Sequence, residues 1–138
     1  MDRRAVDRWI AEYFRCWKER DADHLVELFT KDAIYRSDPF REPHVGSEEI
    51  HRYWSNSTST QAGFRHWIGV VGVDGDRAWV EWWATWTEGN EPYTLPGCLL
   101  LRFSPDGRCS ELREYWHVDH TLRDPPPGWL APDLPQRD

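Results

Sequence analysis

A chain of 138 residues is long enough for one domain with its own core, and a second domain is not expected. Its net charge is −7, with the basic side chains scattered singly, which argues against nucleic acid as a partner. No apolar run approaches the roughly 20 residues that span a bilayer, and the N-terminus carries no signal-peptide pattern, so we expect a cytoplasmic protein without membrane contact.

Tryptophan is unusually frequent, at ten residues of 138. Four tryptophans lie in residues 79–86, a segment whose alternation predicts a strand. One face of this strand would be wholly apolar, and the other would carry Trp79, Glu81, Trp83 and Thr85. Because both faces are rich in apolar side chains, the sheet should be covered on both sides. A carboxylate among indoles is typical of a pocket wall, although bulky core packing gives the same pattern.

The first half of the chain predicts helices. Apolar residues at helical spacing indicate an amphipathic helix over residues 3–20, with Tyr13 inside the apolar stripe. Asp21 is a good N-cap for a second helix that ends near residue 30, and a short strand follows at 33–36. We expect a loop at 38–46, a third helix capped by Ser47, and a polar loop at 55–60.

The second half predicts strands. Residues 64–73 and 77–87 should form a hairpin around an Asp-Gly turn, followed by a loop at 88–96. Further strands are expected at 97–104 and 108–119. Three long strands after three helices predict an α+β fold, with an antiparallel sheet covered by helices on one side. The tail 121–138 holds five of the ten prolines, so we expect it to be extended or partly disordered unless Trp129 and Leu130 dock on the body or on a second subunit.

Four stretches carry a family resemblance. They are Asp21–Phe29 with Asp32-Ala33, the Pro43-x-x-Gly46 loop that enters the helix with Ile50, Val80-Glu81-Trp82, and Leu112-Arg113-Glu114-Tyr115-Trp116. Together with the element order, they make the chain resemble the nuclear transport factor 2-like superfamily, and within it the SnoaL-like group. The resemblance covers roughly residues 4–120, so a domain at 1–120 and a proline-rich tail at 121–138 are expected.

The resemblance implies a cone: a curved antiparallel sheet closed by three N-terminal helices around a central pocket. It also implies a homodimer that packs sheet against sheet, which would cover the second apolar face of the strand at 79–86. Members of this superfamily include ketosteroid isomerase, limonene epoxide hydrolase, polyketide cyclases and noncatalytic binding proteins. The fold therefore leaves the activity open.

Asp38 and Tyr13 are candidate catalytic residues. By resemblance to ketosteroid isomerase, Asp38 before Pro39 falls at the general base and Tyr13 at the oxyanion-hole tyrosine. Leu99 stands where the isomerase keeps a protonated aspartate, which argues against steroid isomerisation. Asp38 could instead fix a turn, and Tyr13 could be a hydrogen-bonded core tyrosine.

The last strand adds a third candidate. Alternation places Arg113, Tyr115 and His117 on one face, and His117 falls where similar SnoaL-like members keep a pocket aspartate. Histidine exchanges protons near neutral pH, so it could take over that role or be a satisfied core residue. Glu81 could pair with Arg113 or His117, either to orient a base or as a structural ion pair. Substrate contacts are expected from Trp79, Trp83, Trp54, Tyr115 and Arg113.

Neither a metal nor another cofactor is expected. The six histidines show no HxxxH or HxH spacing, and the three cysteines show no CxxC motif. The leading hypothesis is a cofactor-independent enzyme that uses general acid/base catalysis on a small apolar molecule, by isomerase, lyase, cyclase or epoxide-opening chemistry. The alternative is a noncatalytic small-ligand-binding or interaction module of the same fold.

Overall fold

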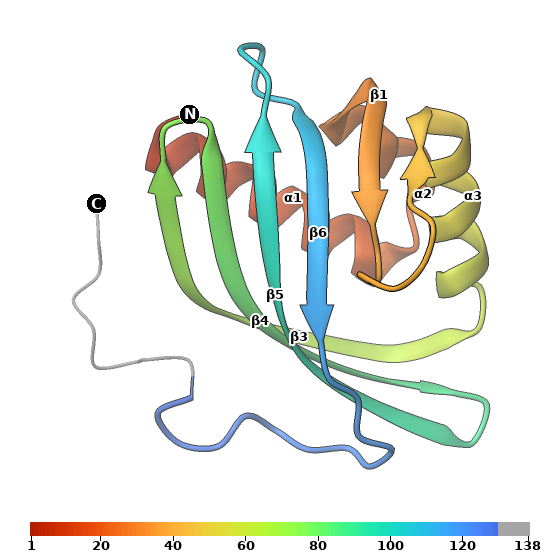
Figure 1. Cartoon of the computed structure of the whole chain (residues 1–138). Helices are drawn as coiled ribbons and strands as arrows, with labels where there is room; N and C mark the ends of the chain where they lie inside the picture. The colour runs from red at the N-terminus through yellow and green to blue at the C-terminus, as the bar shows by residue number, and fades with distance from the viewer. Residues whose placement is uncertain (130–138) are drawn as a thin grey trace.

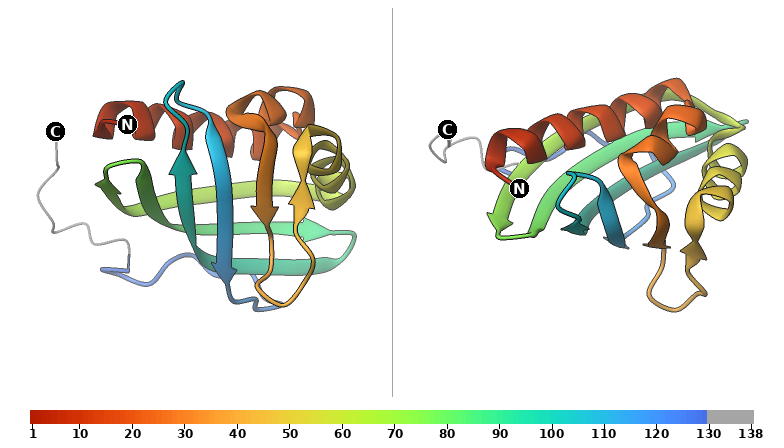
Figure 2. Two further views of the ribbon diagram at one scale, coloured as in Figure 1. Left: turned by 45° about the horizontal axis from the view of Figure 1, so that its top comes forward. Right: turned by 90° about the horizontal axis from the view of Figure 1, so that it is seen from above.

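The computed structural model describes residues 1–129 and shows an α+β fold, as predicted. Helix α1 (Arg3–Glu19) and helix α3 (Gly46–Thr58) lie on the concave side of one curved sheet (Figures 1 and 2). The short helices α2 (Ala22–Leu25) and η1 (Val26–Leu28) connect α1 to the sheet. The other face of the sheet carries no helix within the described residues (Figure 1).

The sheet has six strands in the order β2-β1-β6-β5-β4-β3. Their bounds are Phe29–Arg36 (β1), His44–Val45 (β2), Gln61–Asp74 (β3), Arg77–Glu88 (β4), Glu91–Phe103 (β5) and Cys109–Trp116 (β6). Neighbouring strands are antiparallel except β1 and β6, which run parallel. This one parallel pair brings the first strand of the chain next to the last.

Helix α1 forms where the apolar period predicts it. The Asp2 side chain caps its first turn by accepting a hydrogen bond from the Ala5 backbone N–H at 2.8 Å. The predicted apolar stripe is the buried face, and it packs against the sheet (Val6, Trp9, Ile10, Tyr13, Phe14, Cys16, Trp17). Tyr13 is therefore held at the centre of the concave side.

Two predicted loops are wrong. The polar run at 55–60 does not leave the helix, because α3 continues to Thr58, whose hydroxyl donates to the Trp54 carbonyl at 2.6 Å. The expected loop at 88–96 is mostly strand, because β4 and β5 continue to a tight turn at Gly89 and Asn90. The prolines in this part of β5 are tolerated because their nitrogens point away from β4, as does the Thr94 N–H, which bonds the Asp119 carbonyl.

Strand alternation sorts the side chains onto two faces. On the concave face, the paired positions Val80, Leu99 and Glu114 form one row across β4, β5 and β6. The next concave row is Trp82, Gly97 and Trp116. Gly97 lets the Trp82 ring lie over the strand, since a Cβ there would come within 2.4 Å of its Cζ2 atom. The convex face shows the intervening rows, among them Glu81, Cys98 and Tyr115.

The described part of the tail runs along the body. Thr94 accepts a hydrogen bond from the Arg123 backbone N–H at 3.0 Å, and the Trp83 indole N–H donates to the Arg123 carbonyl at 2.8 Å. Trp129 packs edge-on against Trp83, with ring centroids 5.5 Å apart. Trp129 is therefore docked on the body, which is one of the alternatives considered for it above. Leu130 and the rest of the tail lie outside the described residues.

Candidate functional site

A buried carboxylate lies between two tyrosines on the concave side of the sheet. The Glu114 Oε1 atom accepts hydrogen bonds from the Tyr35 hydroxyl at 3.0 Å and from the Tyr13 hydroxyl at 3.3 Å. The two hydroxyl oxygens are 2.8 Å apart, and since each hydroxyl has one proton, a tyrosine that donates to the other does so in place of Glu114. Tyr13 comes from α1, Tyr35 from β1 and Glu114 from β6, so three elements distant in sequence build this group.

Burial governs the protonation of this group. It raises the pKa of the Glu114 carboxyl to about 7, against the lowering effect of the hydrogen bonds from Tyr35 and Tyr13. Burial and the nearby Glu114 carboxylate raise the pKa of both tyrosines well above the ordinary value, so both stay protonated and can donate. Near neutral pH, Glu114 is therefore present in both its acid and its base form.

An aromatic cavity of about 170 Å³ lies next to Glu114. Helix α1 contributes Trp17 to its wall and α3 contributes Trp54, while Trp82 and Trp86 come from β4. The other lining residues are Tyr53, Ser57, Gln61, Glu88, Leu95 and Trp116. The cavity is smaller than the roughly 300–1,000 Å³ of drug-sized ligand sites, so it suits a compact molecule.

The two oxygens of Glu114 differ in their surroundings. Oε1 receives both tyrosine hydrogen bonds, whereas Oε2 receives none from residues 1–129. A carboxyl fixed through one oxygen presents the other in a defined direction, which is what proton transfer to a bound molecule requires. Glu88 also lines the cavity, but it is only half-buried at the end of β4.

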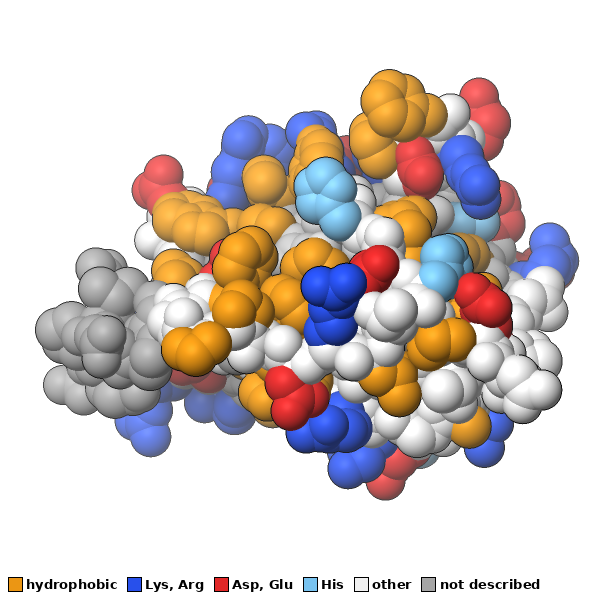
Figure 3. Space-filling model, turned by 90° about the horizontal axis from the view of Figure 1, so that it is seen from below, with side chains coloured by type: hydrophobic (Ala, Val, Ile, Leu, Met, Phe, Trp, Pro, Cys, Tyr) orange, Lys and Arg blue, Asp and Glu red, His pale blue; other side chains and the backbone are white. Residues whose placement is uncertain are grey.

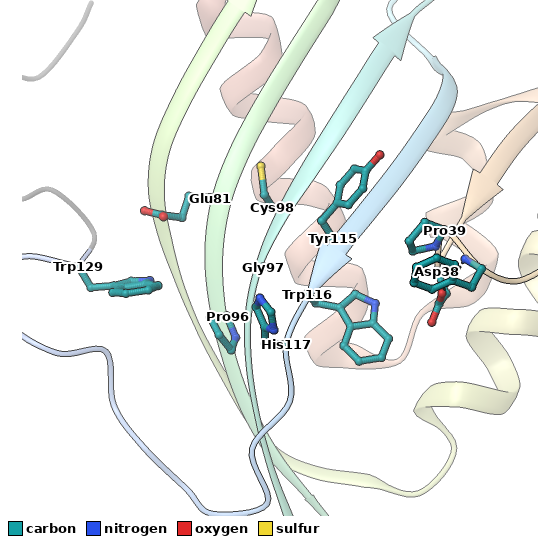
Figure 4. Close-up of a pocket in the computed structure, with 11 residues that line it drawn as sticks. Asp38, Pro39, Glu81, Pro96, Gly97, Cys98, Tyr115, Trp116, His117 and Trp129 are labelled. Atoms are coloured by element: carbon teal, nitrogen blue, oxygen red, sulfur yellow. Dashed lines mark hydrogen bonds between the residues drawn. The ribbon is translucent and has the colours of Figure 1, made fainter.

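A second, larger hollow of about 480 Å³ lies on the convex face. Figure 4 shows how strand rows build it, with Glu81, Cys98 and Tyr115 in one row and Pro96 beside His117. Trp129 bounds one side of this outer hollow, and Asp38 lies on the opposite side beyond Trp116 (Figure 4). Figure 3 views the molecule from below and shows groups of hydrophobic side chains with charged side chains of both signs scattered between and around them.

The outer hollow contains three of the four predicted catalytic residues, Asp38, Glu81 and His117. The Asp38 Oδ1 atom accepts a hydrogen bond from the Phe40 backbone N–H at 2.8 Å, which is the turn-fixing contact considered above. The His117 side chain is exposed. Neither considered ion pair of Glu81 is present, because Arg113 instead bonds Glu111 at 3.0 Å and His117 makes no ion pair within residues 1–129.

The structure thus divides the predicted site residues between two faces. Tyr13 and Trp54 lie in the interior, near Glu114. The remaining predicted substrate contacts lie on convex-face rows of β4 and β6 (Trp79, Trp83, Tyr115, Arg113). Tyr115 lines the outer hollow, and Trp83 contacts its Trp129 wall.

Glu114 and Tyr35 were not predicted as site residues from the sequence. A signal for Glu114 was available, since it is the one charged residue between Leu112 and Trp116 on an otherwise apolar strand face. Tyr35 had no comparable signal. Its role depends on the parallel pairing that sets Tyr35 opposite Leu112, and this pairing joins segments far apart in the chain.

Two further findings concern the described residues only. No helix among residues 1–129 is long and apolar enough to cross a membrane. The same residues contain no group of three or more histidine, cysteine, aspartate or glutamate side chains placed to hold a metal ion.

The structure is an α+β fold in which a curved six-stranded sheet holds a buried carboxyl under covering helices. The family model for the SnoaL-like domain matches residues 10–112, and the chain belongs to this family. The predicted resemblance to the SnoaL-like group is therefore confirmed. No curated protein matches the chain.

Several solved structures share the fold. The epoxide hydrolase/cyclase-like enzyme SalBIII, which acts in pyran ring formation in the polyether salinomycin, is 20% identical and covers 84% of this chain and 93% of its own, with a TM-score of 0.73. A hypothetical protein with a ketosteroid isomerase-like fold from Catenulispora acidiphila, in complex with trimethylamine, is 17% identical and covers 78% and 83%, with a TM-score of 0.70. At these identities the likeness establishes the fold, and the activity has to be argued from the site.

Proposed function

We propose that the protein is a cofactor-independent enzyme that uses Glu114 for general acid/base catalysis on a small apolar molecule. One observation carries this proposal: a carboxyl with its pKa raised to about 7 borders an aromatic cavity and is held through one oxygen by two tyrosines. A catalytic acid or base works best when its pKa lies near the working pH. A carboxylate held in a structural ion pair would instead have a lowered pKa and would stay ionised at neutral pH.

The proton moves at Glu114 Oε2 in this proposal. In the acid form, Oε2–H donates to an oxygen of the bound molecule as a C–O bond opens. In the base form, Oε2 accepts a proton from a hydroxyl or an activated C–H group. Tyr35 and Tyr13 keep Oε1 in place and stabilise the charge that appears when the proton leaves.

Epoxide opening and cyclisation are the reactions to test first. The epoxide hydrolase/cyclase-like neighbour has the same fold, and such reactions need one proton donor and one acceptor rather than a redox group. The cavity of about 170 Å³ limits the substrate to a compact molecule or to the reacting end of a longer one.

The decisive experiment measures turnover of compact epoxides, lactones and enolisable ketones by the wild-type protein and by Glu114→Gln. The amide keeps the shape but cannot exchange the proton, so turnover should fall by about 100-fold to 10,000-fold. Glu48→Gln, the same change at an exposed position of α3, is the matched control. A substrate turned over equally by wild type and Glu114→Gln would refute the role of Glu114.

The noncatalytic alternative makes a different prediction for the same panel. A binding module would be stabilised thermally by some of these compounds but would convert none of them. Binding without conversion across the three substrate classes would therefore favour the alternative over the enzyme.

The acid/base pair predicted from the sequence, Asp38 and His117 with Glu81 as an orienting partner, belongs to the outer hollow and is the rival assignment to Glu114. A homodimer through the same convex face is proposed as well. Trp79, Leu100 and Tyr115 are 42%, 40% and 46% exposed there, an apolar surface that a second copy could cover. In such a dimer the outer hollow would lie at the interface.

A further inference from the structure

Three tryptophans around the interior cavity have an unused hydrogen-bond donor. In residues 1–129, four buried side-chain nitrogen or oxygen atoms find no partner, and three of them are the indole nitrogens of Trp54, Trp82 and Trp86. All three side chains line the cavity and are at most 6% exposed. They surround Trp17, whose ring centroid is 5.4 Å from those of Trp54 and Trp82 and 5.6 Å from that of Trp86.

The other buried tryptophans of residues 1–129, Trp9, Trp17 and Trp83, all have an acceptor for the indole N–H. Trp17 donates to the Gln61 side-chain oxygen at 2.8 Å, and Trp9 donates to the Leu28 carbonyl at 3.0 Å. Trp83 and Trp116 likewise donate to backbone carbonyls, each at 2.8 Å. Since buried donors are normally satisfied, three unsatisfied donors around one cavity call for a hydrogen-bond acceptor inside it.

We propose that the interior cavity recognises compact apolar molecules that carry carbonyl, lactone or epoxide oxygens, through the indole N–H groups of Trp54, Trp82 and Trp86. This inference rests on the proposed function for the cavity and adds the chemical class of the ligand. An indole nitrogen can only donate, so it selects acceptor oxygens. The aromatic rings supply the apolar contact for the rest of the molecule.

The three unpaired indole N–H groups favour a neutral acceptor over an organic cation, although the Glu114 and Glu88 carboxyl groups also line the cavity. The Gln61 amide, the one side-chain amide in the lining, is already engaged, since its oxygen accepts from Trp17 and its nitrogen donates to the Ser57 carbonyl at 3.1 Å. A cation could use the ring faces, but it would leave the three N–H groups unpaired. An acceptor molecule satisfies them and places its oxygen in the cavity that Glu114 borders.

The test uses nuclear magnetic resonance of the wild-type protein labelled with ¹⁵N at its indoles, titrated with matched probes. Cyclohexanone and δ-valerolactone present acceptors, methylenecyclohexane has the shape of cyclohexanone without the oxygen, and tetramethylammonium is a compact cation. Single Trp→Phe variants at 54, 82 and 86 assign the three signals, and Trp67→Phe, outside the cavity lining, is the control.

The two acceptor probes should shift at least one of the three indole signals and bind about tenfold more tightly than methylenecyclohexane. The Trp→Phe variant of a shifted indole should lose that preference, and Trp67→Phe should keep it. Equal affinity for cyclohexanone and methylenecyclohexane, tighter binding of tetramethylammonium, or no shift of the three signals would each overturn the inference.

Failure of this inference is distinguishable from failure of the proposed function. Acceptor preference is measured by binding alone, whereas the role of Glu114 is measured by turnover. Binding with acceptor preference but without turnover would keep the ligand class and reject the enzyme. Turnover that depends on Glu114, without acceptor preference in binding, would keep the enzyme and reject the ligand class.

Discussion

The interior cavity and the outer hollow are built from opposite faces of the same strands, yet they differ in chemistry. Strand β6 supplies Glu114 to the cavity and Tyr115 to the hollow from adjacent positions. In the interior, burial raises the pKa of Glu114 to about 7 and two tyrosines fix it. In the outer hollow, His117 is exposed and Asp38 is engaged with its own loop.

The difference shows that acid/base competence depends on burial as well as on residue type. The outer hollow has the larger volume and more of the residue types expected in a catalytic site. The cavity has fewer titratable side chains in its lining, but one of them, Glu114, is hydrogen-bonded to two buried tyrosines in a low-dielectric environment. Each of the following experiments tests whether this contrast decides where the chemistry occurs.

The largest expected effect separates the two regions by activity. Glu114→Gln should lower turnover by about 100-fold to 10,000-fold, whereas Asp38→Asn and His117→Gln should change it by about twofold or less. Steady-state kinetics on one converted substrate checks this expectation. A larger loss in His117→Gln than in Glu114→Gln would move the active site to the outer hollow.

The second effect is on pH-dependent stability. The carboxyl pKa of Glu114 is about 7 in the folded protein and near 4.5 when unfolded, so the folded state binds more protons between these values. The free energy of unfolding should therefore fall as pH rises through this window, by about 3 kcal/mol.

Urea unfolding of wild type and Glu114→Gln across the same pH range isolates this contribution, because Gln cannot titrate. The stability difference, wild type minus variant, should decrease from low to neutral pH. A constant difference would mean that Glu114 has an ordinary pKa in the folded protein.

The third effect concerns the proposed dimer on the convex face. Leu100→Glu places a charge on the exposed apolar surface of β5 and should weaken self-association by about 30-fold. Sedimentation velocity at micromolar concentration measures it, with Val45→Glu on the edge strand β2 as a control of similar exposure. A monomeric wild-type protein would contradict the dimer and leave the outer hollow open to solvent.

The smallest effect compares the two tyrosines. Tyr35 makes the shorter hydrogen bond to Glu114, so Tyr35→Phe should raise the pKa of this carboxyl further and cost about 1 kcal/mol of stability. Tyr13→Phe should have a weaker effect on the same pKa, because its bond is longer. Carbon-13 resonance of the Glu114 carboxyl during a pH titration distinguishes them, and a lowered pKa in Tyr35→Phe would contradict the assigned hydrogen bond.

Local patterns predicted much of the fold. The apolar period of residues 3–20 gave α1, and the Asp-Gly turn gave the β3–β4 hairpin. The errors occurred where polar or turn residues were interpreted without their neighbours. Residues 55–58 stay helical because Trp54 anchors that end of α3, and the prolines of β5 are tolerated because no ladder bond to β4 needs their nitrogens.

The candidate site was predicted less well, although the alternation along β6 was correct. Alternation separates Glu114 from Tyr115 and His117, but it does not say which set faces the helices. By resemblance we placed the set with Tyr115 and His117 in the pocket. In the structure, the concave face under the helices carries Glu114 instead. Only Tyr13 and Trp54 of the predicted residues lie in that interior.

The sequence by itself determined the period of each element, the family and the face on which each side chain lies relative to its neighbours. These properties depend on residues close together in the chain, where backbone geometry is regular. The tertiary structure alone decided which face became the interior and that Tyr35 meets Glu114, 79 residues away. It did so because sheet curvature and the parallel β1–β6 pairing arise from contacts between distant segments, and burial by those contacts shifts the pKa of Glu114.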